Sequence, residues 1–427
     1  MDLGRWILIR NEITGQGTTE QPRTQSFPGS YWLAKCELEE LYCTYFPRKI
    51  VDLLPQQMTQ DWIELLVGGT GEGAVVADTY GYLRRLKCRK MFREAYRLAR
   101  LHGDGYLIIG IDDGLPSYEP VNENAIASID WLFPLEINEL YPYESNNYLY
   151  PSTWRIATNY SRRPGEVEEY IDKNLIVHSS RILRFSGDYL PPEQRLGNFG
   201  NYASCLQSFW SALEPYLTAC DGAAEGVSKI LSLIYYLEGL SDIVADGTEA
   251  ADKVKNRVRS IRREWGNYKS LGLDKDTETA EWVTPSLANV SNIIETLREN
   301  VVSASGIPAS YLFGRWMGGG LSSDGAIDRF IMAQLVGQHQ EDYFRENLEV
   351  LLRYIFLAAD SPAQEPTDWE LKFQDTLRLT QLEQAELREA IAKTDQIYLA
   401  NQVLSVEEVR LSSFGGATYS IERNLDE

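Results

Sequence analysis

Apolar residues recur at helical spacing along most of the chain, and this spacing predicts six helical segments besides a basic one at residues 253–269. In the segment at 326–359, Ile327, Phe330 and Ile331 begin one apolar face, and Leu348, Leu351 and Leu352 continue it. The predicted helical segments cover residues 31–54 with an interruption at Pro47, 79–101, 203–237, 285–305, 326–359 and 382–397.

Short runs rich in β-branched residues lie between the helical patterns, mostly within residues 106–185. Gly, Pro and Asn separate these runs, as expected for strands joined by loops. The predicted strands cover residues 106–111, 126–132, 175–178, 182–185 and 282–283. We therefore predict an α+β fold that is predominantly helical.

A glycine-rich stretch separates the last two long helical patterns. A helix is expected to stop at Gly306-Ile307-Pro308, and the next one to begin near Ala326. Between them the sequence reads Arg315, Trp316, Met317, Gly318, Gly319 and Gly320. A loop of this composition can adopt positive φ, so it is a candidate for a functional loop that carries one cation and one large aromatic ring. A loop packed against its own subunit is the alternative.

The chain is strongly acidic, with a formal net charge of −21 from 62 acidic and 41 basic residues. Proteins that bind DNA tightly without sequence specificity neutralise its phosphates with many cations. The acidic surface of this chain, taken as a whole, therefore does not suit such binding. Five cysteines without a CxxC pair favour buried free thiols over a zinc site or disulfides. The apolar runs fall short of the roughly 20 residues of a membrane span, and no membrane partner is predicted.

Two segments concentrate the basic residues. One is the 79–101 helix, which is either a solvated face or a contact for acidic surface on another subunit. The other is a predicted helix at 253–269, in which an apolar face lies opposite cations that either pair with nearby acids or bind DNA or an acidic partner. Its basic residues are Lys253, Lys255, Arg257, Arg259, Arg262 and Arg263.

No catalytic, cofactor or metal-binding motif is present. His102, His178 and His339 are far apart in sequence, and neither GxSxG, HExxH nor GxxxxGK[ST] occurs. The glycines around Asp104 precede a predicted strand, which is the wrong order for a dinucleotide fingerprint. We therefore predict no catalytic residues, no cofactor and no metal.

Three stretches resemble the portal proteins of tailed bacteriophages. They read SGIPASYLFGRWMGGGLSSDGAIDRF from Ser305, YFPRKIVDLLPQQMTQDW from Tyr45 and VHSSRILRFSGDYLP from Val177. The first is similar to a subgroup in which SGIP, LFG and a Gly-rich loop precede a long helix. The resemblance covers about a quarter of the chain and includes no catalytic signature.

This resemblance implies an order of regions as well as a function. The regions would be an N-terminal arm and wing (1–202), a stem helix (203–239), a clip (240–284), a second stem helix (285–305), a channel loop (306–325), a long wing helix (326–359) and a crown (360–427). The protein would form a twelve-subunit ring at one capsid vertex of the virion, assembled in the host cytoplasm.

The implied ring is a channel for double-stranded DNA during packaging and ejection, without sequence specificity. Residues 315–320 would face the DNA, and the basic helix would lie in the clip. The implied partners are terminase, a head-tail adaptor, the major capsid protein and, as a further candidate, a scaffolding protein.

Two alternatives stay open from sequence. The chain could be another virion structural protein, such as an adaptor or a minor capsid protein, although adaptors are usually much smaller. It could also be a nucleic-acid-processing enzyme with a carboxylate site, which a magnesium-dependent nuclease assay would reveal.

Overall fold

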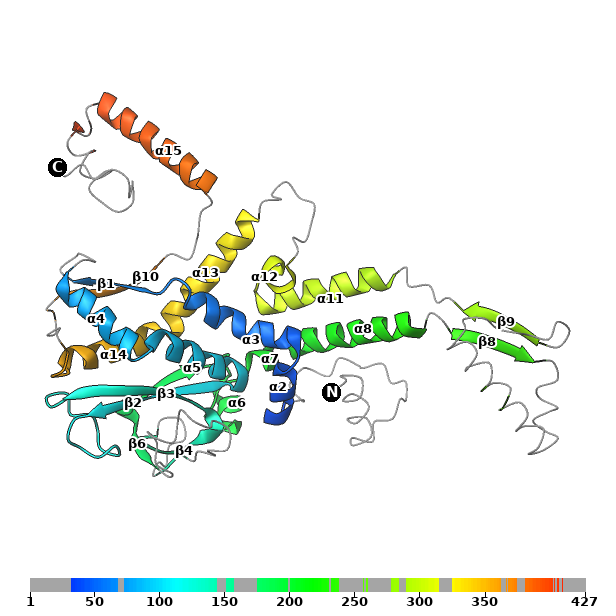
Figure 1. Cartoon of the computed structure of the whole chain (residues 1–427), viewed down its shortest axis with the longest axis horizontal. Helices are drawn as coiled ribbons and strands as arrows, with labels where there is room; N and C mark the ends of the chain where they lie inside the picture. The colour runs from blue at the N-terminus through cyan, green and yellow to red at the C-terminus, as the bar shows by residue number, and fades with distance from the viewer. Residues whose placement is uncertain are drawn as a thin grey trace.

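The computed structural model describes residues 32–67, 73–143, 151–156, 175–198, 200–229, 232–237, 278–283, 289–314, 325–361, 368–374 and 381–401, with a few single positions besides. Figure 1 shows a mixed body, a long helical hairpin that projects from it, a two-stranded ribbon beyond the hairpin and a separate C-terminal helix. The predicted α+β, predominantly helical fold is confirmed.

The helices and strands follow one another in three groups. The body begins with α2 (Lys35–Tyr42), α3 (Tyr45–Met58), β1 (Ile63–Val67), α4 (Ala74–Arg85), α5 (Cys88–His102), β2 (Asp104–Asp112), β3 (Ser128–Glu136), η1 (Ile137–Glu139), β4 (Leu140–Pro142), β5 (Thr153–Ile156), β6 (Ile176–His178), η3 (Ser179–Arg181), β7 (Ile182–Ser186), α6 (Pro192–Gly197) and α7 (Cys205–Ser208). The projecting part contains α8 (Trp210–Lys229), β8 (Ser232–Leu237), β9 (Glu278–Val283), α11 (Val290–Ser305) and α12 (Ala309–Phe313). The chain then returns through α13 (Ala326–Tyr343), α14 (Arg345–Leu357), β10 (Trp369–Phe373) and α15 (Gln381–Ala400).

Strand β2 is the centre of the body because both of its faces are buried. It pairs antiparallel with β3 on one side and with β7 on the other. Leu107 and Ile109 face the main core, whereas Tyr106 and Ile108 face a smaller core next to the β4-β5-β6 sheet. Burial on both faces explains why this strand reads as a continuous apolar run rather than an alternating one.

Helix α5 packs on β2, where Gly105 permits the close approach, and Gly103 permits a second one, between the end of α5 and the backbone at Tyr202. A Cβ on Gly105 would lie 2.1 Å from the Ala95 carbonyl oxygen, and one on Gly103 would lie 2.2 Å from the Tyr202 carbonyl oxygen. Gly103 also has a φ of 98°, a conformation that favours glycine. The glycines around Asp104 are therefore packing residues, in line with the rejection of a dinucleotide motif.

Three predicted helices differ from the structure. The 79–101 pattern is split into α4 and α5 at Lys87, whose φ of 51° is incompatible with a continuous helix. The 326–359 pattern is interrupted at Phe344, between α13 and α14. The helix expected up to residue 237 ends earlier, because residues 232–237 form β8 and pair with β9.

Phe344 is the centre of an aromatic cluster that joins the C-terminal helices to the first half of the body. Its side chain is fully buried, with 0% exposure. The ring makes edge contacts with Trp62, Phe92, Tyr96 and Phe185, at centroid distances of 6.3, 5.6, 5.6 and 5.8 Å. Such edge-to-face pairs add to the burial energy. The predicted 326–359 helix is therefore interrupted at Phe344, the residue that anchors it to the first half of the body.

His339 lies on α13 beside the same cluster, and its environment predicts a pH dependence of stability. Its Nδ1 lies 2.7 Å from the Tyr96 hydroxyl. Burial and the nearby Arg100 cation lower the pKa of His339 to about 4, below its ordinary value of 6.5. The unfolded chain therefore takes up a proton on this imidazole at a higher pH than the folded protein does.

We expect the contribution of neutral His339 to be complete above pH 6.5 and to be lost as the pH falls from 6.5 through 4. The difference between the pKa of His339 in the unfolded chain, 6.5, and in the folded protein, about 4, corresponds to a change on the order of 3 kcal/mol in the free energy of unfolding. Urea unfolding between pH 7 and pH 4 would measure this change. The variant His339→Gln, which offers Tyr96 an acceptor that does not titrate in this range, should show a shallower slope; an identical slope would contradict the assignment.

Candidate functional site

The projecting hairpin and the chain segment beside its base form the most distinctive part of the molecule. Helices α8 and α11 lie side by side and antiparallel (Figure 1). At the base, Leu213 and Val301 are fully buried. Farther along, Ile293 of α11 is 56% exposed. The hairpin is thus anchored at one end, and apolar surface remains uncovered along its length.

A short helical connection leads from the hairpin to the glycine-rich loop. Helix α11 ends at Gly306, whose φ of 66° and N–H bond to the Val302 carbonyl close the last turn. Ile307 is buried, and Pro308 starts α12. The helix stop predicted at residues 306–308 is confirmed, although the five-residue α12 that follows it was expected to be loop.

An aromatic clamp, made of Phe46, Tyr216 and Phe313, fixes the point where the chain enters the loop. Phe313 stacks on Phe46 with a centroid distance of 5.0 Å, and Tyr216 lies 5.3 Å from Phe46 and 5.8 Å from Phe313. The Arg298 guanidinium lies 4.3 Å from the centre of the Phe313 ring. Burial raises the pKa of Tyr216 to about 12, so its hydroxyl stays neutral. Four helices, α3, α8, α11 and α12, meet at the clamp.

The glycine-rich loop is bounded by two glycines in the left-handed region. Gly314 follows α12 with a φ of 68°, and Gly325 precedes α13 with a φ of 69°. Nothing lies within 4 Å of a Cβ built on Gly314, so its backbone conformation, rather than space, favours glycine there. The predicted DNA-facing residues Arg315, Trp316, Met317, Gly318, Gly319 and Gly320 fall outside the described residues.

Helix α13 presents an apolar stripe to solvent directly after this loop. The stripe consists of Ile327, Phe330 and Ile331, which are 56%, 51% and 42% exposed. The opposite side of the helix is buried through Met332, Val336 and Gln340, and Gln340 donates to the Met58 carbonyl at 2.7 Å. The apolar periodicity at 327–331 therefore marks an outer face and not the face that packs on the body. A cluster of large apolar side chains this exposed is typical of an interaction surface.

The predicted basic helix is described only in part. Asn256 and Arg259 are helical, and the Arg259 side chain is exposed. Lys253, Lys255, Arg257, Arg262 and Arg263 lie outside the described residues. The β8–β9 ribbon flanks this segment in sequence, with Ser232 opposite Val283 and Leu237 opposite Glu278.

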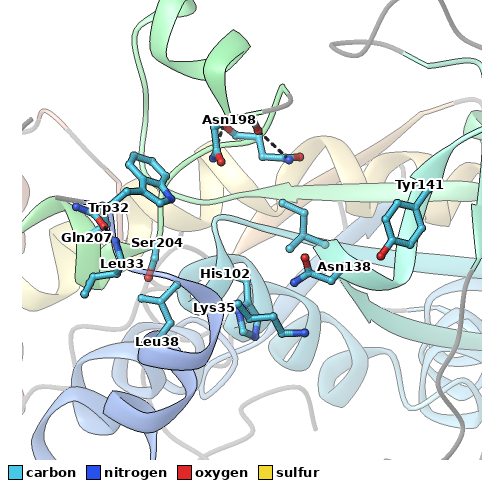
Figure 2. A pocket seen from close by; sticks show the side chains of 12 residues that line it. Trp32, Leu33, Lys35, Leu38, His102, Asn138, Tyr141, Asn198, Ser204 and Gln207 are labelled. Carbon is cyan, nitrogen blue, oxygen red and sulfur yellow. Dashed lines mark hydrogen bonds between the residues drawn. The ribbon is translucent and has the colours of Figure 1, made fainter. Parts of the chain in front are cut away.

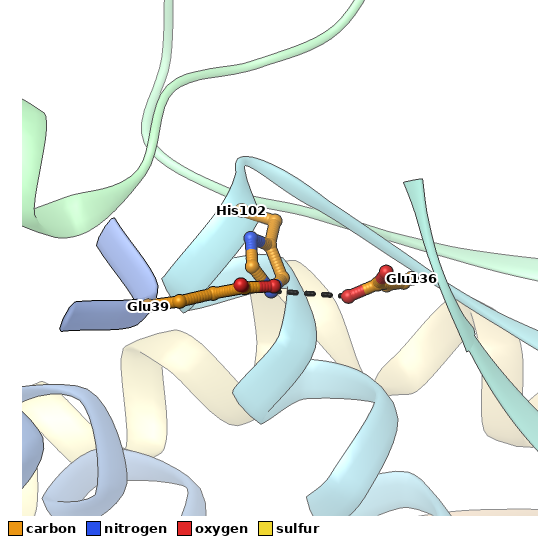
Figure 3. A group of neighbouring side chains, drawn as sticks. All are labelled: Glu39, His102 and Glu136. Atoms are coloured by element: carbon orange, nitrogen blue, oxygen red, sulfur yellow. Dashed lines mark ion pairs between the residues drawn. The ribbon is translucent and has the colours of Figure 1, made fainter. Parts of the chain in front are cut away.

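The structure also brings together three side chains that the sequence analysis did not connect. Glu39, His102 and Glu136 come from α2, α5 and β3 and lie together in Figure 3. One carboxylate oxygen of each glutamate and one ring nitrogen of His102, all atoms that could coordinate a metal, lie within 4.8 Å of one another. His102 Nε2 is 3.3 Å from Glu136 Oε2. The Lys35 ammonium donates to Glu136 and lies 3.6 Å from a Glu39 oxygen.

This arrangement is best described as an ion-pair network. Lys35 already supplies positive charge between the two carboxylates, which is the role that a metal ion would have there. The network borders a cavity of about 400 Å³, shown in Figure 2, in which Trp32, Asn138 and Tyr141 contribute to the wall. Glu39 and His102 are 63 positions apart, and His102 and Glu136 are 34 positions apart, so no local sequence signal links the three residues.

The comparisons with known proteins give one family match and several more distant relatives. The family model described as phage portal protein matches residues 41–397. A protein of Sphingomonas paeninsulae named anti-CBASS protein Acb1 is 22% identical over 415 residues, which is 91% of this chain and 62% of that protein. A protein of the same name from a Caulobacter species is 22% identical and covers 71% of this chain and 49% of that protein. The chain thus spans about half to three fifths of these relatives.

One solved structure has a comparable fold. It is a chain from the neck of an empty gene transfer agent (GTA) particle, treated with C6 symmetry, with a TM-score of 0.50 and 13% sequence identity. The alignment covers 91% of this chain and 96% of that chain. At this identity the similarity concerns the fold alone. Among the described helices, none is long and apolar enough to span a membrane.

Proposed function

The chain belongs to the phage portal protein family, and from this premise we propose that it forms a ring of twelve copies at one vertex of a phage capsid. Double-stranded DNA would enter and leave through the centre of that ring during packaging and ejection. The resemblance found in the sequence is in accord with the family match, which extends over most of the chain.

The exposed apolar stripe on α13 is the observation that carries the proposal. A closed ring needs a heterologous interface, in which one patch of each subunit contacts a different patch of the next. Ile327, Phe330 and Ile331 leave a contiguous apolar surface uncovered in the single chain. Burial against a neighbouring copy would remove this surface from water and stabilise the assembly.

The position of the glycine-rich loop supports the channel role. Its first end is held by the aromatic clamp, and its second end opens the helix that carries the apolar stripe. Rotational symmetry would place one copy of Arg315 and Trp316 from each subunit around the axis. The Arg315 cation of each subunit could contact successive phosphates as the DNA passes. The acidic surface of the rest of the chain would limit adhesion of the DNA.

We propose that the regions implied by the resemblance correspond to elements of the structure, with one revision. We assign the stem to α8 and α11, and we place the β8–β9 ribbon with the clip rather than with the first stem helix. Terminase and a head-tail adaptor would dock at the clip, near Arg259. The wing and crown would face the major capsid protein and, as a further candidate, a scaffolding protein, after assembly in the host cytoplasm.

A structural role without catalysis fits the described side chains. The three histidines take part in separate contacts: His102 with Glu136, His178 with Ser180 and His339 with Tyr96. We do not transfer the function in the relatives' name to this chain. Both relatives are considerably longer than this chain and only 22% identical to it. The portal family model, in contrast, matches residues 41–397 of this chain.

The loop offers a direct test of the channel proposal. Replacing Arg315-Trp316-Met317 by Gly-Ser-Gly should leave the mass of the assembled ring unchanged, because the clamp and the α13 stripe are intact. DNA packaging or retention in complemented phage should fall at least tenfold. Unchanged packaging would remove the loop from the mechanism, and a wild-type particle mass equal to one chain would refute the ring itself.

A further inference from the structure

A basic cavity lies where α4 ends, α5 begins and the β1–β10 pair closes the body. Its volume is about 730 Å³. Among the residues that the structure describes, no Asp or Glu lines it, although the chain carries 62 acidic residues. The cations that line this basic cavity are Arg84, Lys87, Arg89, Lys90 and Arg93.

The positive charge of the basic cavity is not balanced within the described part of the chain. None of its five cations forms an ion pair with a described carboxylate; Arg89 donates to the Thr59 and Gln60 carbonyls, and Arg84 donates to the Tyr80 carbonyl. Other cations of the same two helices do find acids: Arg85 lies 2.8 Å from Asp360, and Arg97 lies 2.9 Å from Asp52.

Arg93 carries a cation of the basic cavity whose side chain is incompletely bonded. Its Nε is buried and has no hydrogen-bond acceptor among the described residues. Burial lowers the pKa of Arg93, repulsion from Arg89 and Arg97 lowers it further, and attraction to Glu94 offsets part of this effect. A bound carboxylate would accept from this guanidinium and offset the repulsion.

The start of α5 adds partial positive charge at the same place. Its N-cap is Lys87, which has a φ of 51° and provides no side-chain cap, and no acidic residue occupies the first turn. The first N–H groups of a helix lack intrahelical acceptors, and they favour a nearby anion. The partial positive charge at the start of α5 thus adds to the charge of the side chains that line the cavity.

The lining of the cavity selects between classes of anionic partner. The half-buried Trp62 offers apolar area beside the cations, while Ile63 and Leu83, which also line the cavity, are only 3% and 4% exposed. A duplex presents phosphates on a convex surface and cannot reach a recessed aromatic ring, whereas a peptide can place a hydrophobic side chain on that ring between its carboxylates. We infer that the basic cavity is a docking site for an acidic peptide segment with an apolar anchor, supplied by a partner protein. This inference does not depend on ring assembly.

The test uses the full chain and three labelled probes in fluorescence anisotropy. The probes are a peptide of six acidic residues around one phenylalanine, its lysine counterpart and a 20-base-pair DNA duplex. Lys87→Glu with Lys90→Glu reverses two exposed charges of the cavity. Lys49→Glu with Arg388→Glu makes the same charge change on α3 and α15, away from the cavity.

The wild type and the control should bind the acidic peptide equally, and the cavity variant should bind it at least tenfold more weakly. The lysine peptide should not bind. The cavity variant should remain folded, because Lys90→Glu places a carboxylate in the first turn of α5, and its thermal midpoint checks this. Lys87→Gln with Lys90→Gln should give an intermediate loss. Equal peptide binding by all variants would overturn the inference, and so would tighter duplex binding that the cavity variant abolishes.

Discussion

Purified protein carrying Ile327→Glu and Phe330→Glu should remain monomeric under conditions in which the wild type forms rings. Both side chains are more than half exposed in the single chain, so the substitution leaves the fold intact. Burying each apolar side chain in an interface contributes about 1.5–3 kcal/mol, and burying an unpaired carboxylate instead costs several kcal/mol more. Every subunit of a ring would bear this cost at its interface. Mass photometry and negative-stain images would measure the outcome.

A matched control separates the apolar stripe from a general effect of charge on α13. Gln338→Glu adds a carboxylate at an exposed position on the same side of the helix, about two turns beyond the stripe. It should assemble as the wild type does, and all variants should share one thermal midpoint for the monomer. If the doubly charged variant still formed complete rings, the subunit interface would have to lie elsewhere.

Phe344→Ala should cause the largest loss of stability among single core substitutions in the body. The side chain is fully buried, and it contacts four rings contributed by the first half of the chain. Truncation removes four edge contacts and leaves a cavity at the junction of α13 and α14. Phenylalanine-to-alanine changes in such positions cost about 3–5 kcal/mol in the free energy of unfolding.

Urea denaturation in the monomeric Ile327→Glu, Phe330→Glu background would measure this loss without a contribution from assembly. Phe344→Leu, which keeps most of the apolar volume, should cost clearly less than Phe344→Ala. A loss below about 1 kcal/mol for Phe344→Ala would show that the surrounding rings collapse into the space, and that the cluster does not anchor the helices.

Local patterns were sufficient for most helices and for strands β2, β3, β6 and β7 of the body, whereas β1, β4, β5 and β10 were not predicted. The stop at Gly306 and the strand around Ile108 followed from turn residues and apolar runs, which act over a few positions. Strand β8 was predicted as helix because its Leu, Ile and Tyr residues also fit a helical stripe. Its partner β9 lies more than 40 positions later, and that pairing decides its conformation.

The interactions between distant segments were beyond reach of the sequence alone. Phe46, Tyr216 and Phe313 form the aromatic clamp across 267 positions, and nothing in the local spacing of any one of them marks it as part of a cluster. The apolar stripe of α13 was visible as a periodic face, but whether that face packs on the body or meets solvent depends on the rest of the fold. The resemblance indicated the loop, and the structure added what holds its ends.

The aromatic clamp also determines how mechanical tension would spread through the molecule. Phe313 stands immediately before Gly314 and is held by Phe46 of α3, Tyr216 of α8 and Arg298 of α11. A pull on the chain at Gly314 would therefore be shared among three helices instead of unravelling the single turn of α12. In the proposed ring, this shared anchorage would let the chain at Gly314 resist a pull from moving DNA.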